Sequence, residues 1–307
     1  MPVPLNTYQF YQQVGVKENI SDVITNLSPR KTPFQSGIGN EKVTQPLFQW
    51  QEDSLRGVNA NAKIDGDDAS FVAIVPPVMR NNYTQIFAES IVVSDRADVI
   101  STYGRKREFA YQMAKSAAQV KRDREHALVG TAGVKAAGNA STASTMAGFQ
   151  TQCDVSTVSF LGAAAPLTEA ALVAALQIAY TNGSEPTRIH VTPSNSVVLA
   201  AFASAAGRYR TITGPNDKTT TLVNVVNLYV SPFGEQKVEI NRFQRDKNTL
   251  IFDPDMWTNV TLRPWERKDL AKTGDSTKAM ILGEFSLKHK NFFASAVIGN
   301  NLAGPAF

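Results

Sequence analysis

Residues 103–131 read YGRKREFAYQMAKSAAQVKRDREHALVGT, and this stretch decides the fold. Its apolar side chains recur at steps of three, four or seven residues, so they share one face of a helix: Phe109, Met113, Ala117, Val120 and Ala127. Good helix formers (Ala, Lys, Arg, Gln and Glu) fill the other positions. With Gly104 before it and Gly130 at its end, the stretch predicts one helix over about 104–130, roughly 40 Å long.

Length and composition describe a globular chain. Its 307 residues suffice for two domains, or for one domain with long excursions. With 43% hydrophobic and 19% charged residues, the chain is not of a disordered class. The single cysteine, Cys153, excludes a disulfide within the chain. Because no apolar run reaches about 18 residues and no signal peptide is recognisable, we expect no membrane partner.

Charge is distributed unevenly along the chain. The net charge of +4 comes from 31 basic and 27 acidic residues. Residues 105–125 hold seven bases and three acids, and this difference equals the whole excess. Residues 52–68 hold five acids and two bases. These segments are either two solvated faces or two complementary surfaces.

The first part of the chain predicts an arm over residues 1–42. Aromatic side chains lie among polar ones, including Tyr8, Phe10 and Phe34. A short helix is predicted over 19–27 and an extended segment over 32–34. Because an arm with this many aromatic side chains would expose a large apolar surface to water, we expect it to lie on its own domain or on a neighbouring molecule.

Residues 43–94 predict a long two-stranded excursion with an acidic tip. Strand patterns at 43–51, 72–75 and 83–94 flank a polar loop. Within the last of these strands, three apolar residues fall on one face at period two: Phe87, Ile91 and Val93. Because an isolated hairpin is marginal in water, the excursion needs a partner surface.

The second half of the chain predicts an α/β lobe over 166–232. Its elements are a helix over 167–180 capped by Thr168, a helix over 194–206, a strand over 188–192 and a buried strand over 222–230. Strands then dominate to the end, over 238–242, 249–252, 260–263, 280–288 and 292–298. We expect them to pack on the long helix, so that 95–165 and 233–307 form one domain split by the lobe. The fold class is α+β.

Motifs that carry chemistry are absent. The sequence has no phosphate loop, no HExxH zinc site and no GxSxG elbow. His126, His190 and His289 have no ligand partners at metal-binding spacing. The acids at 65–68 resemble a calcium loop only loosely, and Cys153 lacks basic surroundings. We therefore expect no catalytic residue, metal or cofactor, which favours a structural or interaction protein.

The order of parts resembles the Hong Kong 97-type coat fold of tailed bacteriophages, and within it the SU-ten-like podovirus major capsid proteins. The stretches that carry the resemblance are 6–34, 48–57 (FQWQEDSLRG), 81–87 (NNYTQIF), 110–130, 231–243 (SPFGEQKVEINRF) and 252–294. They cover most of the chain.

The resemblance implies names and a function for these parts. Residues 1–42 become the N-terminal arm, 43–94 the extended loop that lies over an adjacent subunit, and 166–232 the axial domain. Copies of the chain would form pentamers and hexamers of an icosahedral shell around double-stranded DNA, assembled in the host bacterial cytoplasm. Portal, separate scaffolding and decoration proteins are the further partners expected. Some relatives crosslink a loop lysine to a neighbour's asparagine, and Lys63 is the corresponding candidate here.

The subunit contacts can be assigned to candidate residues: Tyr8, Phe10, Phe34, Trp50, Glu52, Asp53, Asp65, Asp67, Asp68, Arg122, Arg124 and Trp265. In one hypothesis, the acidic loop docks on Arg122 and Arg124 of a neighbour. In the competing hypothesis, these bases contact the phosphates of packaged DNA. Three alternatives to the coat function stay open at this point: an encapsulin-like nanocompartment shell, a soluble α/β enzyme with an unrecognised site, and a minor virion part.

Overall fold

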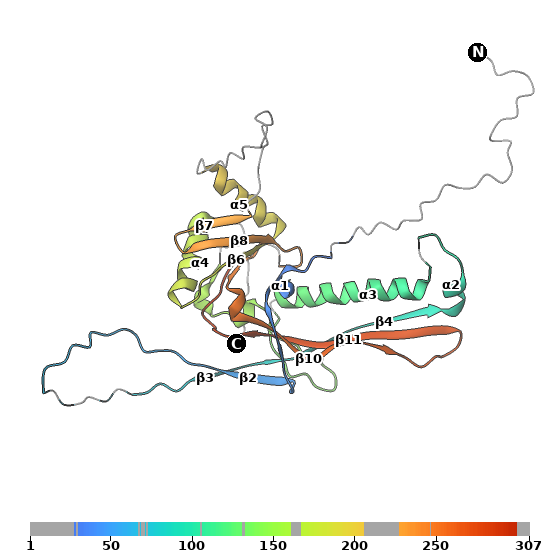
Figure 1. The fold of residues 1–307 in the computed structure, drawn as a ribbon, viewed down its shortest axis with the longest axis horizontal. Coiled ribbons are helices and arrows are strands. Elements are labelled where there is room, and N and C mark those ends of the chain that lie inside the picture. Colours follow the sequence, from blue (N-terminus) through green and yellow to red (C-terminus); the bar gives the residue numbers. More distant parts are fainter. Residues whose placement is uncertain are drawn as a thin grey trace, which may run out of the picture.

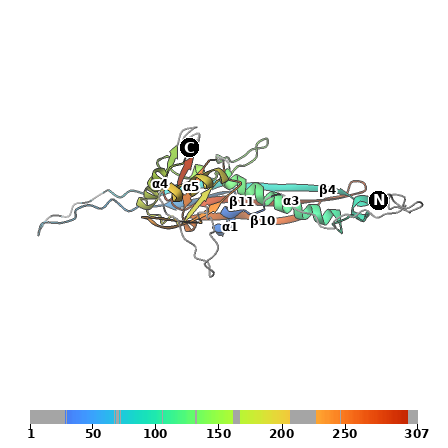
Figure 2. The ribbon, with the colours of Figure 1, turned by 90° about the horizontal axis from the view of Figure 1, so that it is seen from above.

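The computed structural model describes residues 28, 30–66, 68, 71, 73–104, 106–130, 133–160, 167–205, 227–245 and 247–299, and all structural statements below concern these residues. Three parts are visible in Figure 1: a long helix along a narrow sheet, an α/β lobe and a thin hairpin. Figure 2 shows that the helix and the hairpin extend from the lobe in opposite directions. The helix predicted over 19–27 lies outside the described residues.

The long helix α3 spans Glu108–Glu125 and continues as a π-helical turn over His126–Gly130. It begins later than predicted because Gly104 has a left-handed φ of +77° and Arg107 is extended. The first turn is capped by a neighbouring element, since the Phe109 N–H donates to the Asp98 carboxylate at 2.9 Å. The long helix is thus confirmed, with a shorter regular part.

The buried face of α3 differs in part from the predicted one. Val120 is buried as predicted, but Ala117 is exposed. Ser116 and Arg124, four residues either side of Val120, are buried instead. The face that contacts the protein interior therefore includes polar side chains, which a pattern of apolar residues cannot reveal.

A four-stranded sheet lies against α3. Its order is β1 (Gly39–Lys42), β10 (Trp257–Asp269), β11 (Ser276–His289) and β4 (Gln85–Ser94). The β1–β10 pair is parallel and the other two pairs are antiparallel. The predicted inward face of β4 is confirmed at Phe87 and Val93, which are both buried. However, β4 pairs with β11 and belongs to this sheet, not to the excursion, and the short helix α2 (Asp95–Val99) then leads towards α3.

The excursion itself is a hairpin of β2 (Leu47–Glu52) and β3 (Val78–Tyr83). The register runs from Leu47 opposite Tyr83 to Glu52 opposite Val78. The described residues between these strands form no further ladder, so the strand predicted over 72–75 is wrong at its described residues, 73–75. The excursion is therefore a short paired stem with a long connecting loop.

The lobe is a six-stranded sheet with the helices α4 (Glu169–Thr181) and α5 (Pro193–Ala205). The strand order is β5 (Val158–Phe160), β12 (Ala296–Gly299), β9 (Thr249–Phe252), β6 (Arg188–Val191), β8 (Gly234–Ile240) and β7 (Leu228–Ser231). The predicted cap of α4 is confirmed, since the Thr168 hydroxyl accepts from the Ala171 N–H at 3.2 Å. Short 3-10 turns lie at Gln150–Gln152, Val155–Thr157 and Pro254–Met256.

Three C-terminal strands pack in the lobe and not on α3, contrary to the prediction. They are β8, β9 and β12. In β9, Leu250 faces an aromatic core and Ile251 faces the lobe helices. A strand that is apolar on both faces needs cover on both, and the lobe sheet provides it. The strand predicted over 222–230 is confirmed over 228–230 as part of β7, but its predicted burial is wrong there, because β7 is an edge strand whose Leu228 is 49% exposed.

The long helix α3 and the four-stranded sheet beside it are called the spine and the spine sheet below. An aromatic core joins the lobe, the spine sheet and the end of the arm. The Phe149 ring stacks on Trp257 at 4.2 Å between centroids, and Trp257 stacks on His289 at 3.9 Å. Phe34 inserts edge-on into the same core. It is held by the helix α1 (Pro33–Gly37), so the extended segment predicted over 32–34 is wrong: proline is well suited to the first turn of a helix.

Candidate subunit interfaces

The loop of the excursion exposes large apolar side chains. Five of them are at least 81% exposed: Leu55, Val58, Ile64, Phe71 and Ile74. They lie on a thin extension that no other part of the described chain covers. So much apolar surface on a slender projection indicates a site that another molecule covers.

Glu52 fixes the base of the excursion. Its carboxylate lies 2.8 Å from Arg80 Nε across the hairpin and also accepts from the Phe292 backbone N–H. The Arg80 guanidinium lies 3.9 Å from the centre of the Phe292 ring. Glu52 therefore holds the excursion on its own subunit, and the structure does not support its predicted role in docking on a neighbour.

Asn82 is a second anchor at the same base, and the sequence analysis did not identify it. Its side chain is fully buried and donates to the Leu287 carbonyl at 2.8 Å. It also accepts from the Ala147 N–H at 2.9 Å. Trp50, a predicted interface residue, lies half-buried on this stem with its ring stacked on Phe48. Its exposed part is available to a neighbour.

The acids of the excursion tip are exposed where they are described. Asp53, Asp65 and Asp68 all face solvent, and Lys63 lies among them on the same loop. Asp67, Tyr8 and Phe10 lie outside the described residues. The contacts predicted for these acids and the crosslink predicted for Lys63 stay predictions.

Two predicted interface residues are internal. Phe34 is fully buried in the aromatic core. Arg124 is 8% exposed: it donates to Asn259 Oδ1 at 3.0 Å and lies over the Phe285 ring. Burial lowers the pKa of Arg124 to about 10, so it is still a cation at neutral pH. An interface role for Phe34 and Arg124 is wrong for this conformation, whereas Arg122 is half-exposed above Phe243.

Glu125 connects three parts of the chain through one buried carboxylate. It accepts from the Phe34 and Gln35 backbone N–H groups of α1 at 2.8 and 3.0 Å. It also accepts from Asn241 Nδ2 of the lobe at 2.7 Å. Glu125 ends the regular part of α3, and no local pattern in the sequence distinguishes it from the exposed acids of the same helix.

Trp265 is 37% exposed and packs on its own sheet. Its ring lies 4.6 Å from Phe285 and 6.4 Å from Phe87. A Cβ at Gly283 would lie 2.7 Å from the ring, so the indole sits above a glycine. The remaining exposed edge is what a neighbouring subunit could contact.

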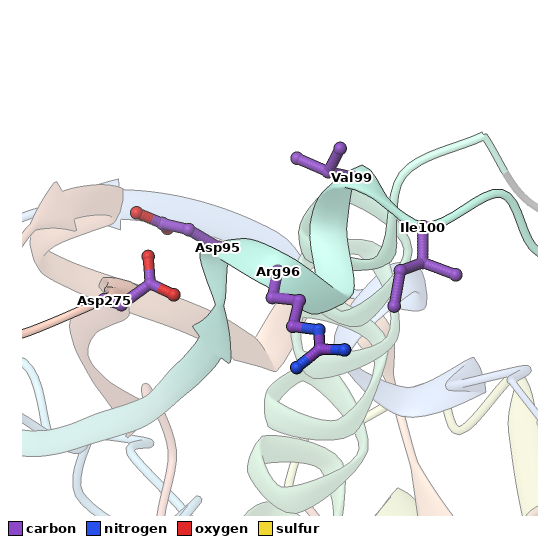
Figure 3. Close-up of a pocket in the computed structure, with 5 residues that line it drawn as sticks. All are labelled: Asp95, Arg96, Val99, Ile100 and Asp275. Atoms are coloured by element: carbon purple, nitrogen blue, oxygen red, sulfur yellow. The ribbon is translucent and has the colours of Figure 1, made fainter.

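The far end of the spine sheet carries a shallow pocket of about 410 Å³ (Figure 3). Asp95 and Asp275 lie on one side of it and Ile100 on the other, with Arg96 between them. The Thr277 hydroxyl and Lys272 both donate to Asp95, and these bonds lower the pKa of its carboxyl. The pocket is open and rests on the tip of the molecule, which fits a contact surface better than a reaction site.

Among the described residues there is neither a candidate metal cluster nor a candidate membrane-spanning helix. No group of three His, Cys, Asp or Glu side chains among the described residues could hold a metal ion. None of the described helices is long and apolar enough to cross a membrane. Burial raises the pKa of the Cys153 thiol, which makes it inert.

Comparisons with known proteins agree on one class. The family model described as SU10 major capsid protein matches residues 4–303. The major capsid protein of Escherichia phage Phieco32 is 31% identical over 337 residues, covering 94% of this chain and 95% of that protein. A capsid chain of a native GTA particle has a TM-score of 0.63 at 13% identity, covering 95% of this chain and 98% of its own. A chain from the structure of phage G major capsid and decoration proteins has a TM-score of 0.55 at 10% identity, covering 98% and 99%.

Proposed function

Because this chain belongs to the SU10 major capsid protein family, we propose that its copies assemble into a closed shell through the excursion, the arm and the spine tip. The chain is a major capsid protein of a tailed phage with a Hong Kong 97-like coat fold. It is a structural protein and not an enzyme. Neither a nanocompartment shell, a minor virion part nor a soluble enzyme is favoured.

The shell we propose is icosahedral and built from pentamers and hexamers. Such a shell needs several unlike contact surfaces on each copy, because one chain meets neighbours in more than one way. The lobe would meet its copies at the centre of each pentamer or hexamer, and the spine tip around Ile100 would meet other copies between them.

One observation carries this proposal: the exposed apolar loop of the excursion. Five of its described side chains are solvated in the single chain: Leu55, Val58, Ile64, Phe71 and Ile74. The Glu52 and Asn82 anchors hold the stem, so the loop projects in a fixed direction. We propose that the loop lies on the adjacent subunit, where its apolar residues are buried, and that Asp65 and Asp68 contribute polar contacts at the rim.

Shortening the excursion tests this proposal. Glu52 and Val78 are paired, so a two-residue Asn-Gly turn can replace residues 53–77 and keep the stem. The variant should fold, with wild-type circular dichroism and cooperative unfolding, but should give no closed shells in negative-stain electron microscopy. A second variant keeps the length and changes the five exposed apolar residues to serine. Closed shells of normal size from both variants would contradict the proposal.

Other partners follow from the coat function. We propose that the shell encloses double-stranded DNA and that a portal and a separate scaffolding protein take part in its assembly in the host cytoplasm. The phage G structure pairs a related coat fold with decoration proteins. A decoration protein on the outer face of this shell is a proposal on the same footing.

A further inference from the structure

The pocket at the far end of the spine sheet exposes a small surface of mixed character. Its lining includes Arg96 and Val99 from α2, Ile100 just after that helix, and Asp275 from the turn between β10 and β11. We name these residues the tip surface. Figure 3 shows Asp275 on one side of Arg96 and Ile100 on the other, so the tip surface carries both signs of charge beside apolar side chains.

Asp95, the remaining residue of the pocket lining, holds the tip together. Its carboxylate accepts from the Thr277 hydroxyl at 2.6 Å and from the Lys272 ammonium at 3.0 Å. Its backbone N–H donates to the Asp275 carbonyl at 3.4 Å. These bonds join α2 to the β10–β11 turn and leave the Asp95 carboxylate occupied. The tip surface is therefore held on a fixed frame, which reduces the conformational freedom that it loses on binding.

The two charged side chains of the tip surface are unpaired. Arg96 and Asp275 are both exposed, and within the described part of the chain neither side chain forms a hydrogen bond or an ion pair. Beyond the pocket, Lys106 is exposed on the loop that leads to α3, and Arg105 lies outside the described residues. The partner is therefore inferred from the pocket lining alone, which leaves one cation and one anion without a partner.

Apolar side chains lie beside these charges. Val99 is 83% exposed and Ile100 is 54% exposed, although both belong to the lining of one pocket. Protein contacts commonly combine an apolar centre with a polar rim. The tip surface has both parts, and its apolar part is solvated in the single chain.

A partner with one sign of charge fits the tip surface poorly. A polyanion such as DNA would be repelled by Asp275, and a basic segment would be repelled by Arg96. A second copy of the same surface carries one charge of each sign, so a rotation axis can bring Arg96 of each copy to Asp275 of a neighbouring copy. This pairing is possible both in a two-fold pair and in a closed ring.

We infer that the tip surfaces of neighbouring copies bind one another through an Arg96–Asp275 ion pair that is repeated around a rotation axis. Val99 and Ile100 are buried at the centre of this contact. The inference rests on the proposed assembly into a shell and specifies the residues of one of its contacts.

Charge reversal in the full chain tests the ion pair. Arg96→Asp places two acids against each other in every contact, and Asp275→Arg places two bases there. A variant with both changes restores opposite charges with the polarity reversed. Lys115→Asp, on the exposed side of α3 and outside the pocket lining, is the control for reversing a charge. Sedimentation velocity gives the concentration at which half of the chain is in closed shells, and electron microscopy identifies the shells.

The expected result is a loss in each single variant and a recovery in the double variant. Each single variant should raise this concentration about fivefold or more, because an exposed ion pair contributes up to about a factor of five and reversal replaces it with repulsion. The double variant and Lys115→Asp should stay within about twofold of the wild type. The unassembled single variants should unfold at the wild-type urea concentration, because both side chains are unpaired in one chain.

A crosslink tests the contact directly. Chains with Arg96→Cys and chains with Asp275→Cys are mixed and treated with a short bismaleimide, because an Arg–Asp pair holds its backbones further apart than a disulfide allows. The native Cys153 is buried and should not react. The mixture should give much more linked dimer than either variant alone.

Normal shells from both single reversals, no recovery in the double variant, or no excess of linked dimer in the mixture would each overturn the inference. Wild-type shells would still uphold the coat function in all three cases. If the wild type forms no shells, the proposed function is contradicted, and the crosslink in solution decides the tip contact by itself.

Discussion

Replacing Glu125 with alanine should destabilise the subunit strongly. The residue is fully buried and accepts three hydrogen bonds of 2.7 to 3.0 Å from Phe34, Gln35 and Asn241. Alanine leaves three buried donors without this acceptor, and each such donor costs about 1–3 kcal/mol. Relief from burying a carboxylate offsets part of this cost. We expect a net loss of about 3–6 kcal/mol, a large share of the ~5–15 kcal/mol that stabilises a typical domain.

Two measurements on the unassembled subunit check this value. Urea unfolding, followed by the fluorescence of the buried Trp257, gives the change in free energy of unfolding. Hydrogen exchange at the Phe34 and Gln35 amides reports whether α1 is released from α3. The matched control is Asp123→Ala, which removes an exposed acid from the same turn and should change stability by less than about 0.5 kcal/mol. Glu125→Gln keeps one acceptor oxygen and should cost less than alanine.

The reasoning fails on one clear result. If Glu125→Ala unfolds within about 0.5 kcal/mol of the wild type and both α1 amides stay protected, the carboxylate does not hold the arm and lobe on the spine. If only the unfolding energy falls while the amides stay protected, Glu125 stabilises the spine without connecting it to α1.

Two further predictions concern the core. Burial lowers the pKa of His289 from 6.5 to about 3, so the unfolded state binds more protons between these values. The stability that neutral His289 contributes is present above pH 6.5, and it falls by at most about 1.4 kcal/mol per pH unit below that value. The free energy of unfolding in urea, measured from about pH 8 to about pH 5, should show this dependence on pH. His289→Gln should make the dependence weaker. A Cβ at Gly130 would overlap His126 Nδ1 and the Phe243 carbonyl oxygen, so Gly130→Ala should cost about 1–3 kcal/mol by thermal or urea unfolding. Gly57→Ala meets nothing within 4 Å and should leave the midpoint unchanged.

Local elements with complete signals could be predicted from the sequence. The helix α4 has a Thr168 cap at its start, apolar residues at helical spacing and Gly183 with a φ of +84° after its end, and each signal lies within one turn of the element it defines. The long helix was equally clear, although its start depended on Gly104 and on Asp98, a cap from another element. Signals supplied by distant residues do not show in a local pattern.

Strand pairing could not be predicted in the same way. β4 has the alternation of a strand, but nothing in residues 85–94 specifies β11 as its partner. The same holds for β9 and β12. Their apolar residues predict that both faces of each strand are buried, but they do not predict which elements cover those faces. Sheet membership is decided by packing between segments far apart in the sequence.

The interface predictions that depend on local composition agree with the structure, whereas those that depend on contacts between distant segments do not. The excursion and its exposed acids follow from composition, because a polar loop between strands has few other places to lie. Phe34 and Arg124 were assigned to an interface because aromatic and basic residues suit one, yet both are internal. Glu125 cannot be identified from the sequence, because a single acid in a charged helix has the pattern of an ordinary surface residue. Its three partners lie on segments that only the fold brings together.

The central claim is that this chain forms a shell from copies of itself. The most direct measurement is negative-stain electron microscopy of the purified full-length chain, alone and with the product of the adjacent gene. Closed shells of uniform size, or discrete pentamers and hexamers, are the predicted result. A small oligomer of fixed size under every condition, with no rings and no shells, would contradict the claim.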